Sequence, residues 1–258
     1  MILNKMNKTK GIILSGGIGT RLFPSTISTS KQLLPVYDKP LIYYPLTTLM
    51  LAGIKDILII TTPKDKERFE SLLQNGKQWG INISYTIQNK PKGVGEALKI
   101  GKNFIKNNNC ILILGDNIFY GNNLINLLKK NIRENNGATI FAYQVKDIKS
   151  YGVVEFNKNF KPIKLIEKPT KSKSNYSITG LYIYDKNAST YANKINQSNR
   201  GEYEITDLNS MYLKKNKLKV IIMGRGYAWF DVGTNESLLE ASQFIYSIEK
   251  RHNFKIAC

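Results

Sequence analysis

The sequence predicts one α/β domain built on a mixed, mainly parallel sheet that is flanked by helices. Three observations support this fold class. Apolar runs of strand length alternate with helical patterns up to about residue 146. Closely spaced strands then follow, which indicates an inserted antiparallel portion. No internal repeat and no linker rich in proline, glycine or serine divides the 258 residues, so we expect a single domain over residues 1–258.

In the first half, short apolar runs bounded by turn residues are typical of buried strands. One further strand, Ile81–Ile87, alternates apolar and polar residues instead. The expected strands are Gly11–Ser15, Ile57–Thr61, Ile111–Leu114, Thr139–Val145 and Ile81–Ile87. Apolar residues at helical spacing, followed by glycine or asparagine as a stop signal, predict the helices between them. These are Pro40–Gly53, Lys64–Leu73, Gly95–Ile105 and Leu124–Ile132. Such alternation favours parallel strands with helices on both faces.

In the second half, three strands lie only a few residues apart, which leaves no room for crossover helices and so predicts antiparallel pairing. They are Val153–Phe156, Ile163–Ile166 and Ile178–Tyr184. Helical patterns follow at Ala188–Ile195 and Thr206–Lys214, then a last strand at Leu218–Met223 and a terminal helix from Asn235 to about Arg251.

Composition excludes several classes of protein. Two cysteines, Cys110 and Cys258, are too few for a disulfide scaffold or a cysteine-built zinc site. One histidine, His252, argues against a histidine-rich metal centre and against Ser-His-Asp chemistry. No apolar run is long enough to cross a bilayer, and the basic N-terminus is not followed by a signal-peptide core. We therefore expect a cytoplasmic protein without a membrane partner.

The formal net charge is +19, from 38 basic and 19 acidic residues. Lysine supplies 32 of the basic residues, scattered along the whole chain, whereas nucleic-acid surfaces concentrate charge on one face. The bias towards lysine, asparagine and isoleucine is typical of an AT-rich genome. We therefore do not expect a nucleic-acid partner, while small anionic substrates agree with the charge.

A glycine loop, Gly16-Gly17-Ile18-Gly19-Thr20-Arg21, follows the first strand directly. Glycines let the backbone approach a phosphate, and their N–H groups can form an anion-binding nest. The loop fits neither the Walker A pattern nor the dinucleotide fingerprint, which needs a small residue where Leu22 stands, so a simple tight turn stays open. Two cations, Arg21 and Lys31, follow it. Together with the glycines they suit a triphosphate and the pyrophosphate that leaves it.

Two aspartates are candidates for binding Mg²⁺. Asp116 comes directly after a buried strand, where a carboxylate is well placed to hold the ion against substrate phosphates. Asp231 is far away in sequence, and the spacing alone does not show that the two converge; a helix-capping role for Asp116 also stays open. A third element, Glu167-Lys168, pairs a sugar-hydroxyl acceptor with a phosphate-binding cation, although such a pair is more often a surface turn.

Many ordered segments resemble the sugar-1-phosphate nucleotidylyltransferases, most closely the glucose-1-phosphate thymidylyltransferases. The resemblance runs from about Lys10 to the last residue and is highly specific. It rests on Gly11–Gly17 with Gly19–Leu22, Lys31–Val36, Tyr43–Leu46, Leu114–Asn117, Tyr151–Phe156, Glu167–Pro169, Ser174–Tyr176, Thr179–Tyr182, Arg200–Glu202 with Glu204–Asp207, and Met223–Trp229.

The resemblance implies a Rossmann-like nucleotidyltransferase domain whose antiparallel portion binds the sugar. It implies that dTTP and glucose 1-phosphate give dTDP-glucose and pyrophosphate, by in-line attack of the sugar phosphate on the α-phosphorus, as the first step of dTDP-rhamnose-type deoxysugar synthesis. Such transfers depend on positioning and charge stabilisation, which explains how a chain with one histidine can be an enzyme. It also implies a Mg²⁺ cofactor and a homo-oligomer, a tetramer in relatives.

The resemblance also assigns roles to individual residues. The catalytic residues are Arg21, Lys31 and Asp116, and the metal ligands are Asp116 and Asp231. The nucleotide-binding residues are Gly16, Gly17, Gly19, Thr20, Arg21, Lys31, Gln32, Gln88 and Gly93, the last two of which read the thymine. The sugar-phosphate-binding residues are Asn117, Gly152, Glu167, Lys168, Ile178 and Arg200.

The chain departs from the family pattern in two places. After Gln88, Gly95 and Glu96 stand where the family usually has alanine and glutamine, at the segment that would distinguish dTTP from UTP. Relatives also continue for some tens of residues past the position of Cys258, so we expect their C-terminal helical extension to be absent. A UTP–glucose-1-phosphate uridylyltransferase and a catalytically idle sugar-nucleotide-binding subunit therefore stay open as alternatives.

Overall fold

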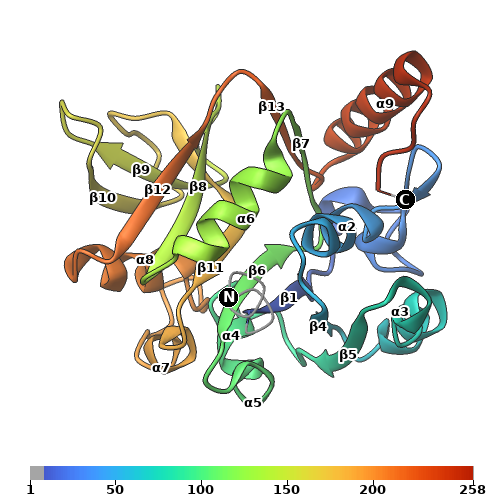
Figure 1. Ribbon diagram of the computed structural model, residues 1–258, viewed down its shortest axis with the longest axis horizontal. Helices are drawn as coiled ribbons and strands as arrows, with labels where there is room; N and C mark the ends of the chain where they lie inside the picture. The colour runs from blue at the N-terminus through green and yellow to red at the C-terminus, as the bar shows by residue number, and fades with distance from the viewer. Residues whose placement is uncertain (1–8, 258) are drawn as a thin grey trace.

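The computed structural model describes residues 9–257, and a nine-stranded mixed sheet forms its centre (Figure 1). Met1–Lys8 and Cys258, the two ends of the expected domain, lie outside the described residues. The strands run in the order β10-β9-β11-β6-β1-β4-β5, with β8 beside β11 and β12 beside β8. Their bounds are β1 (Thr9–Ser15), β4 (Asp56–Thr61), β5 (Asn82–Ile87), β6 (Asn109–Leu114), β8 (Ala138–Gln144), β9 (Gly152–Phe156), β10 (Pro162–Glu167), β11 (Tyr176–Tyr184) and β12 (Leu218–Met223).

Strand direction decides where the functional loops meet. Strands β6, β1, β4 and β5 pair in parallel, so their carboxyl ends lie at one edge of the sheet. Strand β11 runs antiparallel to both β6 and β8, which brings its first residues to that same edge. The antiparallel strands β9 and β10 extend the sheet beyond β11. The loops after the parallel strands therefore face the antiparallel portion across this edge.

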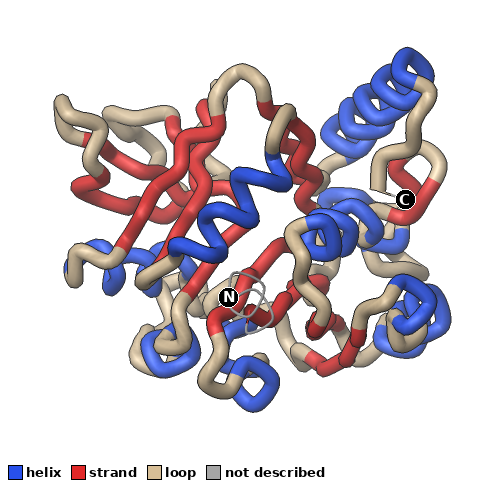
Figure 2. The backbone as a smooth tube through the Cα atoms, viewed as in Figure 1, coloured by secondary structure: helices blue, strands red, loops and turns tan. Residues whose placement is uncertain are grey.

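Helices cover both faces of the sheet (Figure 2). One face carries α2 (Tyr43–Leu51), α3 (Lys66–Leu73) and α6 (Leu124–Glu134); the other carries α4 (Glu96–Ile100), α5 (Lys102–Ile105), α7 (Ala188–Ala192) and α8 (Ile205–Lys214). Successive strand residues alternate between the two cores, as Ile12 and Ile13 do, and both are fully buried. Strands that are apolar on both faces explain the continuous apolar runs in the sequence.

Outside this sheet, a two-stranded ribbon joins two distant parts of the chain. Strand β7 (Asn117–Gly121) pairs antiparallel with β13 (Tyr227–Asp231), and the register places Asp231 opposite Asn117. A short hairpin, β2 (Pro35–Val36) with β3 (Lys39–Pro40), packs with the long helix α9 (Asn235–His252) around a third apolar cluster. The 3-10 turns η1 (Thr20–Leu22), η2 (Lys31–Leu33) and η3 (Lys77–Trp79) complete the described elements.

The predicted fold class is confirmed, with local differences. The expected helix over Gly95–Ile105 is two short helices, α4 and α5, that meet at Gly101. A Cβ on Gly101 would lie 2.8 Å from Cδ1 of Ile12, so this bend lies directly against the sheet. The sequence pattern did not predict the β7–β13 ribbon, because its partners are more than 100 residues apart and each strand is short.

The central strand β6 offers a test of the core. Ile113→Ala should lower the free energy of unfolding by about 2–5 kcal/mol, because it removes a fully buried side chain and leaves a cavity. The matched control is Ile163→Ala in β10, where the isoleucine is 58% exposed and a change within about 0.5 kcal/mol is expected. Urea denaturation of both variants checks the difference, and equal effects would contradict it.

Candidate active site

Most of the predicted nucleotide-binding residues line one hollow of about 200 Å³ at the carboxyl edge of the sheet. They come from the loop after β1, the turn η2 and the loop between β5 and α4. They are Gly16, Gly17, Lys31, Gln32, Gln88 and Gly93. Gly19 and Thr20 belong to the same glycine loop but line neither this hollow nor the neighbouring one.

The glycine loop allows a close approach of two chain segments. A Cβ on Gly16 would overlap Oε1 of Gln88, so only glycine leaves room for that carboxamide. Gly19 has a φ of 71°, in the left-handed region that favours glycine, and its carbonyl accepts a hydrogen bond from the Thr26 hydroxyl at 2.7 Å. Close packing therefore requires a glycine at Gly16, and the backbone conformation favours a glycine at Gly19.

Lys31, Asp116 and Asp231 meet at the boundary of this hollow. The Lys31 ammonium forms a salt bridge with the Asp116 carboxylate. Burial alone would lower the pKa of Lys31, but Asp116, and Asp231 more weakly, raise it above its ordinary value. Lys31 therefore stays charged next to the point where substrate phosphates would lie.

The Asn117 carboxamide connects the two aspartates. Its Nδ2 donates to Oδ1 of Asp116 at 3.0 Å and to Oδ1 of Asp231 at 3.2 Å. Its Oδ1 accepts from the Gly180 amide at 3.0 Å and from the Trp229 indole at 2.7 Å. The two carboxylates, 115 positions apart in the chain, are thereby brought together as the Mg²⁺ hypothesis requires.

Asp231 lies in an environment that opposes its charge. Burial, and next the Asp116 carboxylate, raise the pKa of Asp231 to about 6, against the lowering effects of Lys31, Arg21 and Asn117. Two carboxylates held close together beside the predicted nucleotide hollow fit a hard divalent cation such as Mg²⁺, which usually takes only one or two carboxylates plus substrate oxygens. No group of three or more histidine, cysteine, aspartate or glutamate residues within 9–257 forms a metal cage.

Arg21 lies on the other side of these carboxylates. It lines the second hollow, and a Cβ on Gly233 would lie 2.7 Å from its guanidinium, so the arginine packs directly on the backbone after Asp231. It also lowers the pKa of Asp231 electrostatically. Arg21 and Lys31 thus flank the aspartate pair from two chain segments.

The second hollow, of about 210 Å³, holds most of the predicted sugar-phosphate residues and shares Val94, Leu114, Asp116 and Glu202 with the first. Asn117, Gly152, Glu167, Lys168 and Ile178 line it. A Cβ on Gly152 would lie 2.8 Å from the Thr206 hydroxyl and 3.3 Å from both Glu167 Oε2 and Ile178 Cδ1, so the glycine leaves the floor of this hollow open.

Arg200 does not line the second hollow but contacts its wall. It donates to Glu204 at 2.9 Å and to Glu167 at 3.1 Å, and lies 3.8 Å from Glu202. Glu167 also accepts a hydrogen bond from the Thr206 hydroxyl. The predicted phosphate-binding arginine therefore pairs with carboxylates in this structure.

Several lining residues were not predicted as site residues, although most lie within the motifs quoted above. Tyr151 and Trp229 form one wall, with ring centroids 5.1 Å apart. Burial, with Asp231 nearby, raises the pKa of Tyr151 to about 12, so its hydroxyl stays protonated. Thr206 and Glu204 contribute polar groups to the same hollow. In the sequence, only their positions within the family motifs indicated a functional role. The folded chain shows that they line one hollow.

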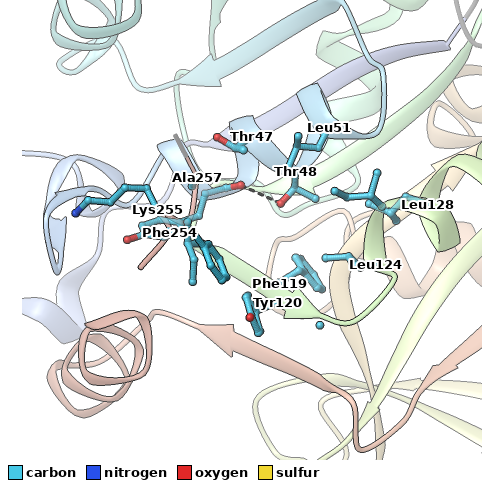
Figure 3. Close-up of a pocket in the computed structure, with 14 residues that line it drawn as sticks. Thr47, Thr48, Leu51, Phe119, Tyr120, Leu124, Leu128, Phe254, Lys255 and Ala257 are labelled. Carbon is cyan, nitrogen blue, oxygen red and sulfur yellow. Dashed lines mark hydrogen bonds between the residues drawn. The ribbon is translucent and has the colours of Figure 1, made fainter. Parts of the chain in front are cut away.

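A third hollow, of about 240 Å³, lies away from these charged groups. Figure 3 shows that Thr48 and Leu51 of α2, Phe119 and Tyr120 of β7, and Leu124 and Leu128 of α6 surround it, together with the segment after α9. Its lining is mainly apolar, and Lys255 points its ammonium away from it. It holds none of the predicted site residues.

The two adjoining hollows, one lined by a glycine loop with two cations nearby and one by the residues predicted to bind a sugar phosphate, agree with a nucleotidyltransferase. The chain belongs to the nucleotidyl transferase family, whose model matches residues 10–248. Within that family it belongs with the glucose-1-phosphate thymidylyltransferases. It is 54% identical to the enzyme of that name from Neisseria meningitidis over 96% of this chain and 86% of that one, and 53% identical to that from Xanthomonas campestris over 98% and 86%.

Solved structures agree with this assignment. A Bacillus anthracis protein assigned to glucose-1-phosphate thymidylyltransferase, solved in complex with sucrose, is 37% identical with a TM-score of 0.85 over 92% of this chain and 94% of that one. A UDP-glucose pyrophosphorylase solved with UDP-glucose has a TM-score of 0.80 at 24% identity over 93% and 99%, which shows a shared fold. Within residues 9–257 no helix has the length and apolar character needed to cross a membrane.

The raised pKa of Asp231 predicts that the site destabilises the fold. Between the ordinary value of 3.8 and about 6, the folded state binds the proton that the unfolded state releases, so stability falls as pH rises through this window. Asp231→Asn should therefore be more stable than the native chain at pH 8, by at most about 3 kcal/mol. At pH 4 the difference should largely disappear. Urea denaturation at both pH values measures it, and a loss of stability at pH 8 would refute the argument.

Proposed function

We propose that the chain transfers a thymidylyl group from dTTP to glucose 1-phosphate, giving dTDP-glucose and pyrophosphate. The observation that carries this proposal is the junction of two hollows at Asp116, one with nucleotide-binding and one with sugar-binding features. The names of the relatives, glucose-1-phosphate thymidylyltransferase, support the choice of substrates. The family resemblance also supports a place at the start of dTDP-rhamnose-type synthesis and a homo-oligomeric state, which both stay predictions.

In the proposed reaction, a phosphate oxygen of glucose 1-phosphate attacks the α-phosphorus of dTTP in line. The new P–O bond forms as the bond between the α-phosphorus and its bridging oxygen breaks, and pyrophosphate leaves with that oxygen. The attacking oxygen already carries negative charge, so no side chain has to remove a proton. Positioning and neutralisation of charge are therefore the main tasks of the protein.

The chain's cations suit these tasks. Lys31, charged and buried beside Asp116, lies where charge on the transferring phosphate would be stabilised. Arg21, at the border of the second hollow, is placed for the same role from the opposite side. Asp116 and Asp231 would hold Mg²⁺, which when bound neutralises phosphate charge and orients the oxygens.

The second hollow suits a phosphorylated sugar. Glu167 and the Thr206 hydroxyl offer acceptors to sugar hydroxyls, and Lys168 at the rim offers a cation to the phosphate. Arg200, paired with Glu167 and Glu204, would have to exchange at least one carboxylate for the sugar phosphate. The aromatic wall of Tyr151 and Trp229 gives the sugar ring an apolar surface.

The test is pyrophosphate release from the purified chain with Mg²⁺ and glucose 1-phosphate, with dTTP and UTP in separate reactions. The proposal expects turnover with dTTP that exceeds turnover with UTP. A clear preference for UTP would instead support the uridylyltransferase alternative. No release with either nucleotide, from protein shown to be folded by circular dichroism, would refute the enzyme proposal and favour an idle subunit.

Asp116→Asn and Asp231→Asn should each abolish most of the activity, because each weakens the two-carboxylate site. The unfolding midpoint of Asp231→Asn should not fall, whereas Asp116→Asn also removes the charged partner of Lys31 and should lower the midpoint. Titration of the variants and the native chain with Mn²⁺, followed by water proton relaxation, measures binding of the ion apart from turnover. Near-native turnover and ion binding in both variants would exclude this metal site.

Lys31→Ala should lower kcat by roughly a hundredfold or more, as removal of other preorganised charge-stabilising donors does. Exposed Lys158 provides a matched control, and Lys158→Ala should keep native kinetics. Steady-state kinetics for both substrates separate the roles. An effect restricted to KM for glucose 1-phosphate would reassign Lys31 to sugar binding.

A further inference from the structure

We propose that Glu96 is a positioning residue that sets the orientation of the Gln88 carboxamide and thereby selects bases with the edge pattern of thymine or uracil over cytosine. The inference rests on the proposed function and on the base-reading role that the family resemblance implies for Gln88. It concerns the position at which this chain departs from the usual glutamine, and it gives that departure a physical role.

The contact between the two side chains is direct. Nε2 of Gln88 donates to Oε2 of Glu96 at 2.6 Å. An ionised carboxylate only accepts hydrogen bonds, so it pairs with the NH₂ end of the amide and repels its oxygen. Gln88 is only 4% exposed, and a charged partner at this distance makes the flipped amide unfavourable. Glu96 therefore fixes the orientation of the Gln88 amide, with its nitrogen towards Glu96 and its oxygen on the opposite side.

The other end of the amide lies against Gly16 in the predicted nucleotide hollow. Oε1 of Gln88 lies in the space that a Cβ of Gly16 would occupy, and both residues line the nucleotide hollow. Among residues 9–257 no donor pairs with this oxygen, which leaves it available to a ligand. Nε2 keeps one hydrogen that Glu96 does not use. The side chain thus presents an acceptor beside a donor.

The backbone around Glu96 is held in place from one side. The Gly95 amide donates to the Tyr203 carbonyl at 2.9 Å, and the Tyr203 amide donates to the Lys92 carbonyl at 2.7 Å. A Cβ on Gly93 or Gly95 would lie 2.7 or 2.8 Å from the Tyr203 carbonyl oxygen, so both glycines are required by this close approach. The Lys99 ammonium covers the Tyr203 ring at 3.2 Å from its centroid. The loop that leads into Glu96, the first residue of α4, is therefore held by several contacts with Tyr203.

The presented pattern matches some bases and not others. Thymine and uracil carry an N3–H donor beside the O4 acceptor, which complements the acceptor and donor of Gln88. Cytosine carries an N3 acceptor beside an N4 donor, so each of its groups would meet a like group. A site built to hydrogen-bond one pattern rejects the opposite one because buried polar groups are left unpaired. Thymine and uracil share the edge, so Glu96 does not distinguish dTTP from UTP.

The test compares dTTP, UTP and dCTP as substrates and, by calorimetry, as ligands of the native chain, Glu96→Gln and Glu96→Asp. In Glu96→Gln, the new amide can either accept or donate a hydrogen bond at the same position. In Glu96→Asp, the carboxylate is kept but lies one methylene farther from Gln88. In both variants the preference for dTTP over dCTP should fall roughly tenfold, as expected when a specifying hydrogen-bond pattern is lost. The ratio of dTTP to UTP should not change.

Glu67→Gln is the control, because Glu67, like Glu96, is a glutamate in the first turn of a helix, but it is exposed, whereas Glu96 is half-buried. It should keep the native ratios. A native chain that accepts dCTP as well as dTTP, or variants with undiminished dTTP preference, would overturn the inference while the proposed function stands. A native chain that is silent with dTTP, UTP and dCTP would overturn the proposed function itself.

Discussion

The site depends on one side chain, the Asn117 carboxamide, which holds two carboxylates of like charge close together. Its nitrogen donates to Asp116 and Asp231, while its oxygen is held by the Gly180 amide and the Trp229 indole. Because Gly180 lies in β11 of the central sheet and Trp229 and Asp231 lie in β13, the amide also joins the central sheet to the β7–β13 ribbon. A Cβ on Gly180 would lie 2.5 Å from this oxygen, so the glycine is part of the same arrangement.

The balance of charge around this amide underlies both the predicted cost in stability and the proposed binding of a cation with phosphates. The aspartate pair opposes its own ionisation, as the raised pKa of Asp231 shows, and Lys31 and Arg21 offset only part of that repulsion. A bound cation and substrate phosphates would complete the balance. Local energetic cost at a functional site is a general feature of proteins whose surrounding fold is stable enough to bear it.

In the proposed function, two groups of polar side chains would divide recognition between the hollows. At the nucleotide end, Glu96 orients Gln88. At the sugar end, Thr206 and Arg200 orient Glu167. In both places glycines, Gly16 beside Gln88 and Gly152 beside Glu167, leave the space into which the polar side chain projects. The same arrangement is therefore present in both hollows: the missing side chain of a glycine on one segment makes room for a polar side chain from another.

The sequence by itself determined the alternation of strands and helices, the glycine loop and the family motifs, because these are local patterns of periodicity and residue order. It also identified Asp116 and Asp231 as candidates without showing that they meet. Their convergence, the break of the helix at Gly101, the β7–β13 ribbon and the Gln88–Glu96 pair were decided only by the tertiary structure. These features join residues that are distant in the chain or depend on packing against the sheet, and no local pattern encodes which distant segments become neighbours.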